Sequence, residues 1–289
     1  TYLIVTTNPS PIDLYWKESF SAIVELRRGD NDATINGTVL WWIIGPEDKL
    51  MDHGYGTTNG TYYSFTYNTS RLLGSYIYRL IINATVSEEP PPNIEFQEPN
   101  DVEKSIVVSE RPTVLDVVFD PAAAIYWNES LTIVVYYTDA LDSSGVIGAN
   151  ITANILGIGI FSLVDDGGGR YTIYFENFYW DSGSYTVIIS ASKGNYTDKE
   201  KTYTLVIYER PTDLNAPTYI SIPWQQNYTL EVEYIESRYA VPVTNATVSY
   251  EARDPQDNIV LCGEMSYING IYMATLNLTS LAELTYTIY

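Results

Sequence analysis

Apolar and polar side chains alternate along most of this 289-residue chain. In residues 131–137 and 185–189, for example, every second side chain is apolar, which is typical of a strand with one face in a core and one in water. Clusters of Gly, Asn, Asp and Thr, as in residues 57–60 and 165–169, separate such runs and predict turns. Because no stretch shows a sustained helical period with capping residues, the pattern predicts an all-β protein with antiparallel sheets.

The sequence pattern recurs three times along the chain. A Trp precedes the first long alternating run of each copy, a Gly-X-Tyr follows it, and a further Tyr comes 14 residues after that tyrosine. The residues are Trp16, Tyr62 and Tyr76; Trp127, Tyr171 and Tyr185; and Trp224, Tyr272 and Tyr286. Glu-Arg-Pro-Thr begins at Glu110 and again at Glu209, marking two boundaries. We therefore expect units of about 100 residues, a size that can bury its own core.

The repeats divide the chain into three expected domains. Residues 1–110 form the first and include a Pro-rich acidic insertion at 88–103, residues 111–210 form the second, and residues 211–289 form the third. The second repeat closes with an alternating run at residues 202–208 that has no counterpart after Tyr286. The third domain is therefore expected to lack its last strand, which leaves an unpaired sheet edge. Two explanations stay open: these residues are a piece of a longer protein, or a neighbouring chain donates the strand.

The late tyrosines resemble the tyrosine corner of immunoglobulin-like sandwiches, in which a Tyr near the start of a late strand bonds backbone upstream. Two of them stand in Gly-Ser-Tyr, at Tyr76 and Tyr185. Two residues further on, where immunoglobulins carry a cysteine, are Tyr78, Val187 and Ile288. The chain thus resembles the tandem Ig-like repeats of prokaryotic, above all archaeal, cell-surface proteins such as S-layer, sheath, adhesin and filament proteins. That resemblance implies three tandem antiparallel β-sandwiches and a structural or adhesive role.

Asn-X-Ser/Thr sequons are in excess. The chain has ten, whereas its 19 Asn and 51 Ser plus Thr would give about three by chance. They stand at Asn36, Asn59, Asn68, Asn83, Asn128, Asn150, Asn195, Asn227, Asn245 and Asn277. We interpret them as N-glycosylation sites of an extracellular, surface-displayed chain, and each such Asn should then face water.

Composition narrows the function. The net charge of −21 and the pI of about 4.2 disfavour nucleic acid and anionic membrane surfaces as partners. A single His and a single Cys disfavour multi-His metal sites and a disulfide framework. The longest apolar run, residues 155–164, is too short to span a bilayer, and no signal peptide is visible, so direct membrane insertion of this segment is not expected.

Candidate metal ligands are few. Asp139, Asp142, Asp165 and Asp166 lie in turns, where paired carboxylate oxygens could bind Ca²⁺, although no EF-hand spacing is present. Solvated turn carboxylates that bond their own backbone are the alternative interpretation. No cofactor other than calcium is expected.

Four other features have structural readings. His53 stands in a Gly-rich loop and is expected at the surface, and Cys262 follows three apolar residues and is expected to be a buried strand thiol. Trp41 and Trp42 are adjacent in a strand, so one ring should lie outside the core, where packing, a sugar platform or a glycan cover would explain it. Arg28-Gly29-Asp30 matches a cell-attachment tripeptide, but a match of three residues is weak.

Together these features predict a non-enzymatic, N-glycosylated extracellular structural protein of a cell surface layer or filament. It would assemble through contacts with copies of itself or with other surface proteins. Two alternatives stay open: an adhesin or carbohydrate-binding surface module, and a non-catalytic fragment of a secreted enzyme. Catalytic residues are not assigned, because no repeat carries a distinctive carboxylate pair of the kind that glycosidases use.

Overall fold

The computed structural model describes residues 1–90, 95–176, 180–223 and 225–289. Within this part of the chain the regular elements are strands and two single-turn 3₁₀ helices, η1 (Pro46–Asp48) and η2 (Thr69–Arg71). The all-β prediction is confirmed. Trp224 and part of the 88–103 insertion lie outside the described residues.

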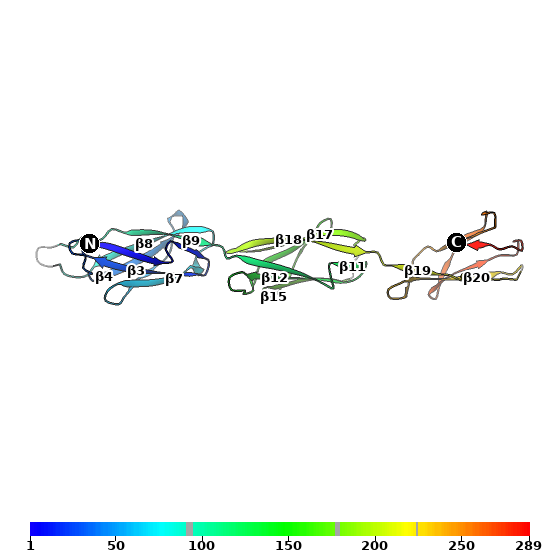
Figure 1. The fold of residues 1–289 in the computed structure, drawn as a ribbon, viewed down its shortest axis with the longest axis horizontal. Helices are drawn as coiled ribbons and strands as arrows, with labels where there is room; N and C mark the ends of the chain where they lie inside the picture. The colour runs from blue at the N-terminus through cyan, green and yellow to red at the C-terminus, as the bar shows by residue number, and fades with distance from the viewer. Residues whose placement is uncertain (91–94, 177–179, 224) are drawn as a thin grey trace. The chain divides into compact units, whose positions relative to one another are not determined.

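Two sheets enclose the first core. A four-stranded sheet has the order β1-β3-β7-β6, and a five-stranded sheet has the order β2-β9-β8-β4-β5 (Figure 1). The strands are β1 (Tyr2–Asn8), β2 (Ile12–Tyr15), β3 (Ser19–Arg27), β4 (Gly37–Ile44), β5 (Leu50–Tyr55), β6 (Thr57–Thr58), β7 (Tyr63–Asn68), β8 (Tyr76–Val86) and β9 (Val102–Ser109). Burial alternates along β3, as the sequence predicts, and its inward side chains belong to one buried cluster with those of β4, β7 and β8. At the centre Trp41 stacks on Phe65, with 5.0 Å between ring centroids.

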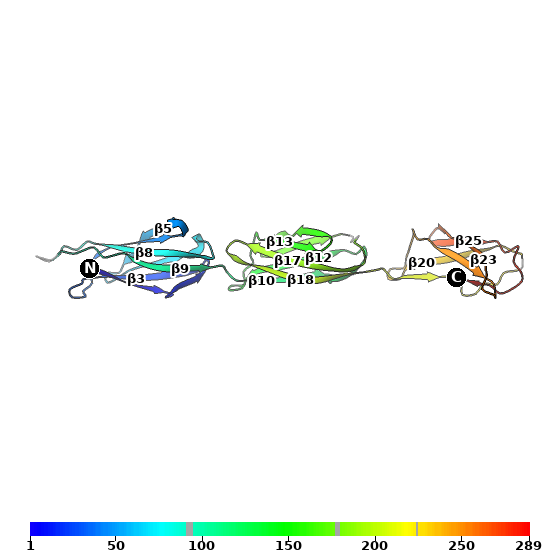
Figure 2. The same cartoon turned by 90° about the horizontal axis from the view of Figure 1, so that it is seen from above.

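We call the parts of the chain that contain β1–β9, β10–β18 and β19–β26 the first, second and third segments. The second segment repeats the topology of the first. Its sheets have the orders β10-β12-β16-β15 and β11-β18-β17-β13-β14, so each strand has a counterpart in the first segment (Figure 2). The strands are β10 (Thr113–Asp120), β11 (Ala124–Tyr126), β12 (Leu131–Asp139), β13 (Asn150–Ile155), β14 (Gly159–Ser162), β15 (Val164–Gly167), β16 (Arg170–Phe175), β17 (Gly183–Lys193) and β18 (Tyr196–Tyr208). In both segments one pair is parallel, β2 with β9 and β11 with β18, which is the strand arrangement of an Ig-like sandwich.

The third segment has smaller sheets. One has the order β19-β20-β25-β24, with β21 also paired to β20, and the other has the order β23-β22-β26. The strands are β19 (Thr212–Asn215), β20 (Tyr228–Glu236), β21 (Val241–Pro242), β22 (Ser249–Arg253), β23 (Ile259–Glu264), β24 (Ser266–Ile268), β25 (Ile271–Leu276) and β26 (Thr287–Ile288). By strand order β26 corresponds to β8 and β17. Among the described residues no strand pairs with the far edge of β26, where β9 and β18 stand in the other segments.

By its contacts the chain divides into two compact units. The larger contains Thr1–Ala123, Ser130–Glu176 and Ser184–Leu205, and the smaller contains, among the described residues, Ala124–Glu129, residues 180–183 and Val206–Tyr289. The boundaries at residues 110 and 210 stay predictions.

The tyrosine corner of the first segment is Tyr78, and the expectation for Tyr76 is wrong. Tyr78 is fully buried; its hydroxyl donates to the carbonyl of Leu73 (3.1 Å) and accepts from the N–H of the same residue (2.8 Å). Tyr76 is 45% exposed because burial along β8 begins only at its third residue. In the third segment the hydroxyl of Tyr286 does donate upstream, to the carbonyl of Ala282 at 2.9 Å.

Candidate functional site

One sequon position recurs at, or just before, the middle strand of every segment. Asn36, Asn150 and Asn245 are exposed there, beside β4, β13 and β22. A buried tyrosine fixes the neighbouring backbone each time by donating its hydroxyl to a main-chain carbonyl at 2.7 Å. The pairs are Tyr63 with Gly37, Tyr171 with Val146 and Tyr272 with Val243. The recurring sequon therefore stands on hydrogen-bonded, solvent-facing backbone at or before the start of the middle strand.

This tyrosine set corrects the sequence alignment in one place. In the first segment the bonded tyrosine is Tyr63, the residue after the expected Tyr62. Two residues separate Gly60 from Tyr63, whereas one residue separates Gly169 from Tyr171 and Gly270 from Tyr272. The sequence offers Tyr-Tyr at this point, and only the strand register decides which ring faces inward.

The other seven predicted glycosylation sites differ in exposure. Asn59, Asn68, Asn227 and Asn277 are exposed, whereas Asn83, Asn128 and Asn195 are half-buried. Among the described residues, the amide nitrogen Nδ2, to which a glycan would be attached, donates to a protein group in three of the ten sequons. The contacts are Asn36 to Glu88 (2.9 Å), Asn68 to the carbonyl of Lys17 (2.9 Å) and Asn83 to Asp101 (2.6 Å). Glycosylation of the ten stays a prediction.

The Trp of the first two copies stands in a Tyr-Trp motif, Tyr-Trp-X-Glu, at residues 15–18 and again at residues 126–129, and this motif forms a closed turn. Lys17 has a positive φ of 72°, and the N–H of Glu18 donates to the carbonyl of Tyr15 at 3.1 Å. The Glu18 carboxylate in turn accepts from the N–H of Tyr15 at 2.9 Å. The second segment repeats each contact at residues 126–129, where Asn128 takes the positive φ of 62° and the two distances are 3.1 and 3.0 Å. We name these two structures the Trp turns.

The arginine of each Glu-Arg-Pro-Thr motif caps a Trp turn. Arg111 donates to the carbonyl of Trp16 at 3.3 Å, and Arg210 donates to the carbonyl of Trp127 at 2.7 Å. Arg111 also pairs with Asp139, which is 1% exposed, and with Asp142 at 2.9 Å. The hydrogen bond that Arg111 donates to the Asp139 carboxylate raises the pKa of the guanidinium above its usual value. From the sequence, the motif that contains these arginines indicated only the boundaries between repeats, whereas in the structure the arginines stabilise the Trp turns.

In the larger unit the turn between β17 and β18 contacts the same Trp turn. We call this cluster, which consists of Arg111, the Trp turn at residues 15–18 and the β17–β18 turn at residues 195–196, the joint; the contact of Arg210 with the second Trp turn is its counterpart in the smaller unit. Tyr196 meets Trp16 edge to face, with 5.5 Å between centroids, and accepts a hydrogen bond from Lys17 at 3.0 Å. The N–H of Gly74 donates to Oδ1 of Asn195 at 2.9 Å, and the N–H of Arg111 donates to the Asn195 carbonyl, also at 2.9 Å. A sequon asparagine is thus part of a packed joint.

The four aspartates proposed for calcium all have protein partners. Asp139 and Asp142 bind Arg111; Asp165 accepts from the N–H groups of Gly148 and Gly167, which lowers its pKa below the usual range; and Asp166 binds Arg170. Among the described residues no group of three or more His, Cys, Asp or Glu side chains could hold a metal ion. Calcium binding here stays a prediction.

The remaining singled-out residues lie apart from the joint. Cys262 is exposed, so the expectation of a buried thiol is wrong: β23 is an edge strand and Cys262 lies on its outer face. His53 is exposed and pairs across strands with Trp42, which is half-buried on the outer face, while Trp41 lies in the core. Asp30 of the Arg-Gly-Asp tripeptide is bound by its own Arg28 at 2.6 Å.

Comparisons with known proteins give a distant likeness. No family model and no curated protein matches the sequence. Among solved structures the chain is similar to invasin, a bacterial integrin-binding protein, at 12% identity and a TM-score of 0.44, over 100% of this chain and 57% of invasin. It is similar to the Yersinia pseudotuberculosis adhesin InvE at 12% identity and a TM-score of 0.37, over 94% of this chain and 73% of that one. The chain therefore spans little more than half the length of invasin. In the described residues no helix is long and apolar enough to cross a membrane.

Proposed function

We propose that this chain is a non-enzymatic, N-glycosylated structural protein displayed on a cell surface, in a layer or filament. The observation that carries the proposal is the exposed sequon that recurs at or before the start of the middle strand in all three segments, at Asn36, Asn150 and Asn245. A sequon that arises from the general abundance of Asn and Thr would have no reason to keep its place in the fold. A glycan at this position would cover the start of the middle strand and protect it from proteases and edge-to-edge association.

The joints suit a spacer. In the larger unit Arg111 ties the Trp turn to β12 through Asp139, and Tyr196 packs on Trp16. Contacts of this kind restrict motion between consecutive sandwiches, in contrast to a Gly/Ser linker. The charge of −21 would keep such molecules apart unless divalent cations or specific contacts join them.

Assembly through strand donation is part of the proposal. A strand from a neighbouring copy would complete the sheet beside β26, at the edge where β9 and β18 stand in the other two segments. Added chelator tests the role of calcium: if cations bridge copies, assembled material should dissociate, and unchanged assembly would remove calcium from the account.

The decisive experiment is glycopeptide mass spectrometry of the native material, combined with electron microscopy of the cell surface. We expect sugar at Asn36, Asn150 and Asn245 and a regular array of copies. Bare asparagines at all three positions would refute the glycoprotein assignment. Glycosylated but isolated molecules would refute the layer or filament.

A second candidate is an adhesin or carbohydrate-binding module. The strand register brings Trp42, His53 and Tyr55 to one outer face of β4 and β5, where Tyr55 is 67% exposed. Aromatic rings on a flat sheet face can stack on sugar rings. Binding of soluble oligosaccharides to the whole chain, abolished by Trp42→Ala and retained in Trp127→Ala, would favour this candidate over the structural one.

A further inference from the structure

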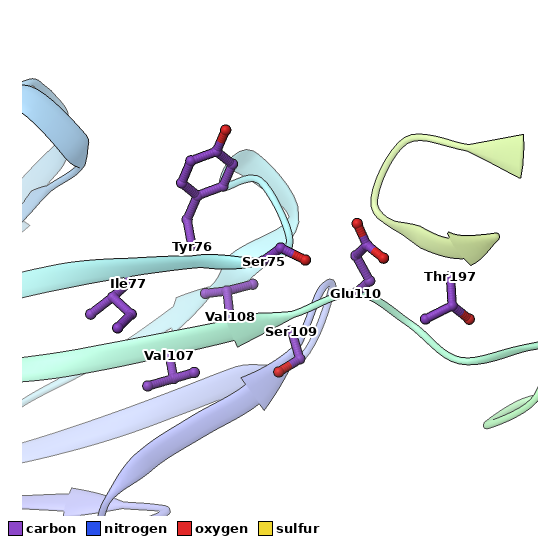
Figure 3. Close-up of a pocket in the computed structure, with 8 residues that line it drawn as sticks. All are labelled: Ser75, Tyr76, Ile77, Val107, Val108, Ser109, Glu110 and Thr197. Carbon is purple, nitrogen blue, oxygen red and sulfur yellow. The ribbon is translucent and has the colours of Figure 1, made fainter.

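A shallow hollow lies at the edge of the joint in the larger unit. It holds about 380 Å³ and is lined by the start of β8, the end of β9, the linker residue Glu110 and Thr197 of β18 (Figure 3). Tyr76 projects from the start of β8 in Figure 3, and Glu110 and Thr197 lie toward the linker. The hollow is therefore built from both of the sandwiches that the joint connects.

The lining combines exposed apolar side chains with an unpaired carboxylate. Tyr76 is 45% exposed, and Ile77, which follows it in β8 and points to the opposite face, is 66% exposed. The Glu110 carboxylate is half-buried, and among the described residues none donates a hydrogen bond to it. Its counterpart Glu209, in contrast, accepts from Ser182 at 3.2 Å. A ligand that offers both apolar C–H faces and hydroxyl donors fits this lining, and a sugar is such a ligand.

A sugar anchor stands at the rim. The sequon Asn195-Tyr196-Thr197 ends in a residue that lines the hollow, and Oδ1 of Asn195 accepts from the N–H of Gly74, two residues before Tyr76. A Cβ atom on Gly74 would lie 3.1 Å from Cα of Glu110, so Gly74 is an immediate neighbour of both Glu110 and Asn195. In the part of the chain that the structure describes, no group accepts a hydrogen bond from Nδ2 of Asn195. Since an N-glycosidic bond uses Nδ2 and leaves Oδ1 unchanged, a glycan can be attached without breaking the bond to Gly74.

We propose that this hollow is a cradle for the first sugars of an N-linked glycan on Asn195, which stack on Tyr76 and donate hydroxyl hydrogen bonds to Glu110. The proposal rests on the proposed function, because it needs the chain to be glycosylated. In the attachment step Nδ2 forms a bond to C1 of a lipid-linked sugar phosphate and loses one proton, and the phosphate leaves with the electrons of the broken C–O bond. The glycan is then covalently attached to the second sandwich and contacts the first one non-covalently, which stiffens the joint between them.

The test uses the whole chain secreted from a eukaryotic host, whose N-glycans begin with two N-acetylglucosamine residues. Mass spectrometry gives the occupancy of each sequon, and hydroxyl-radical labelling gives the accessibility of Tyr76. The first control is Asn195→Asp, which keeps the acceptor for Gly74 but cannot be glycosylated; the second is the wild-type chain from a host without N-glycosylation. Tyr136, 42% exposed on β12, serves as an internal reference.

We expect Asn195 to be occupied and Tyr76 to be labelled about threefold more slowly than in either control, because a sugar over the ring removes most of its exposed area. Labelling of Tyr136 should not change. The variant Glu110→Ala should keep Asn195 occupied and restore fast labelling of Tyr76, since the cradle loses its acceptor. Equal labelling of Tyr76 with and without an occupied Asn195 overturns the cradle and leaves the glycoprotein assignment intact. A bare Asn195 among otherwise occupied sequons does the same, whereas ten bare sequons overturn the proposed function itself.

Discussion

Arg111 should be the most sensitive single residue of the joint. Its guanidinium is the charged partner of Asp139, whose carboxylate is 1% exposed. Replacing Arg111 by Ala leaves that carboxylate buried without its counter-charge, and breaking a buried pair in this way costs about 3–5 kcal/mol. Asp139 keeps the hydrogen bond from the N–H of Leu141, at 2.9 Å, so we take the lower end, about 3 kcal/mol.

The assay is thermal unfolding of the whole chain, followed by calorimetry. For a unit of this size each kcal/mol lowers the midpoint by about 2–4 °C, so Arg111→Ala should lower the transition of the larger unit by about 6–12 °C. The matched control is Arg210→Ala: Arg210 caps the other Trp turn, in the smaller unit, through carbonyl groups, so its loss should cost that unit only about 1.5 kcal/mol.

A double variant tests the cause. Adding Asp139→Asn to Arg111→Ala removes the buried charge and keeps the acceptor for Leu141, so most of the lost stability should return. If Arg111→Ala and Arg210→Ala cost the same, or if Asp139→Asn restores nothing, the ion pair is not what stabilises the joint.

Three further predictions concern single side chains. Burial and the neighbouring Asp52 charge raise the pKa of Tyr67 to about 12, so above pH 10 the unfolded chain ionises first and stability falls between pH 10 and 12; Tyr67→Phe should lessen that fall in alkaline unfolding curves, and an unchanged curve would contradict the assignment. Asn68, whose Nδ2 donates to two protein groups, should carry less glycan than Asn59 in glycopeptide spectra, and equal occupancy would count against this reasoning. Tyr171→Phe should cost about 2 kcal/mol in chemical unfolding because it strips partners from buried backbone, whereas the exposed Tyr174→Phe should change little; similar losses would show that the buried hydroxyl is unimportant.

The period-two pattern was sufficient to predict the strands, because inward and outward positions differ in polarity whatever the partner strand is. The pattern could not predict which strands lie at an edge. The run before Cys262 looks like a core strand, but β23 borders a three-stranded sheet and exposes the thiol. The choice between Tyr62 and Tyr63 likewise depends on a register that one extra residue changes.

The joint shows a different limit. Both of its halves, the Tyr-Trp motif and Glu-Arg-Pro-Thr, are visible as repeats in the sequence. Their meeting is not, because Arg111 and Asp139 are 28 residues apart and come together only through the pairing of β10 with β12. Read without that pairing, Asp139 resembles a calcium ligand as much as an arginine partner.

The geometry of the two Trp turns also explains why the residue after the Trp differs between them, Lys17 in one and Asn128 in the other. The turn needs a positive φ at Lys17 and at Asn128, since this bend exposes the Trp carbonyl to the capping arginine. Asn adopts this backbone readily, whereas a lysine there costs about 1 kcal/mol. Lys17 offsets the cost through its ammonium group, which lies 4.5 Å from the Trp16 ring centroid and donates to Tyr196. The backbone geometry is therefore what the repeat preserves, and each copy stabilises it with the side chains that its own joint supplies.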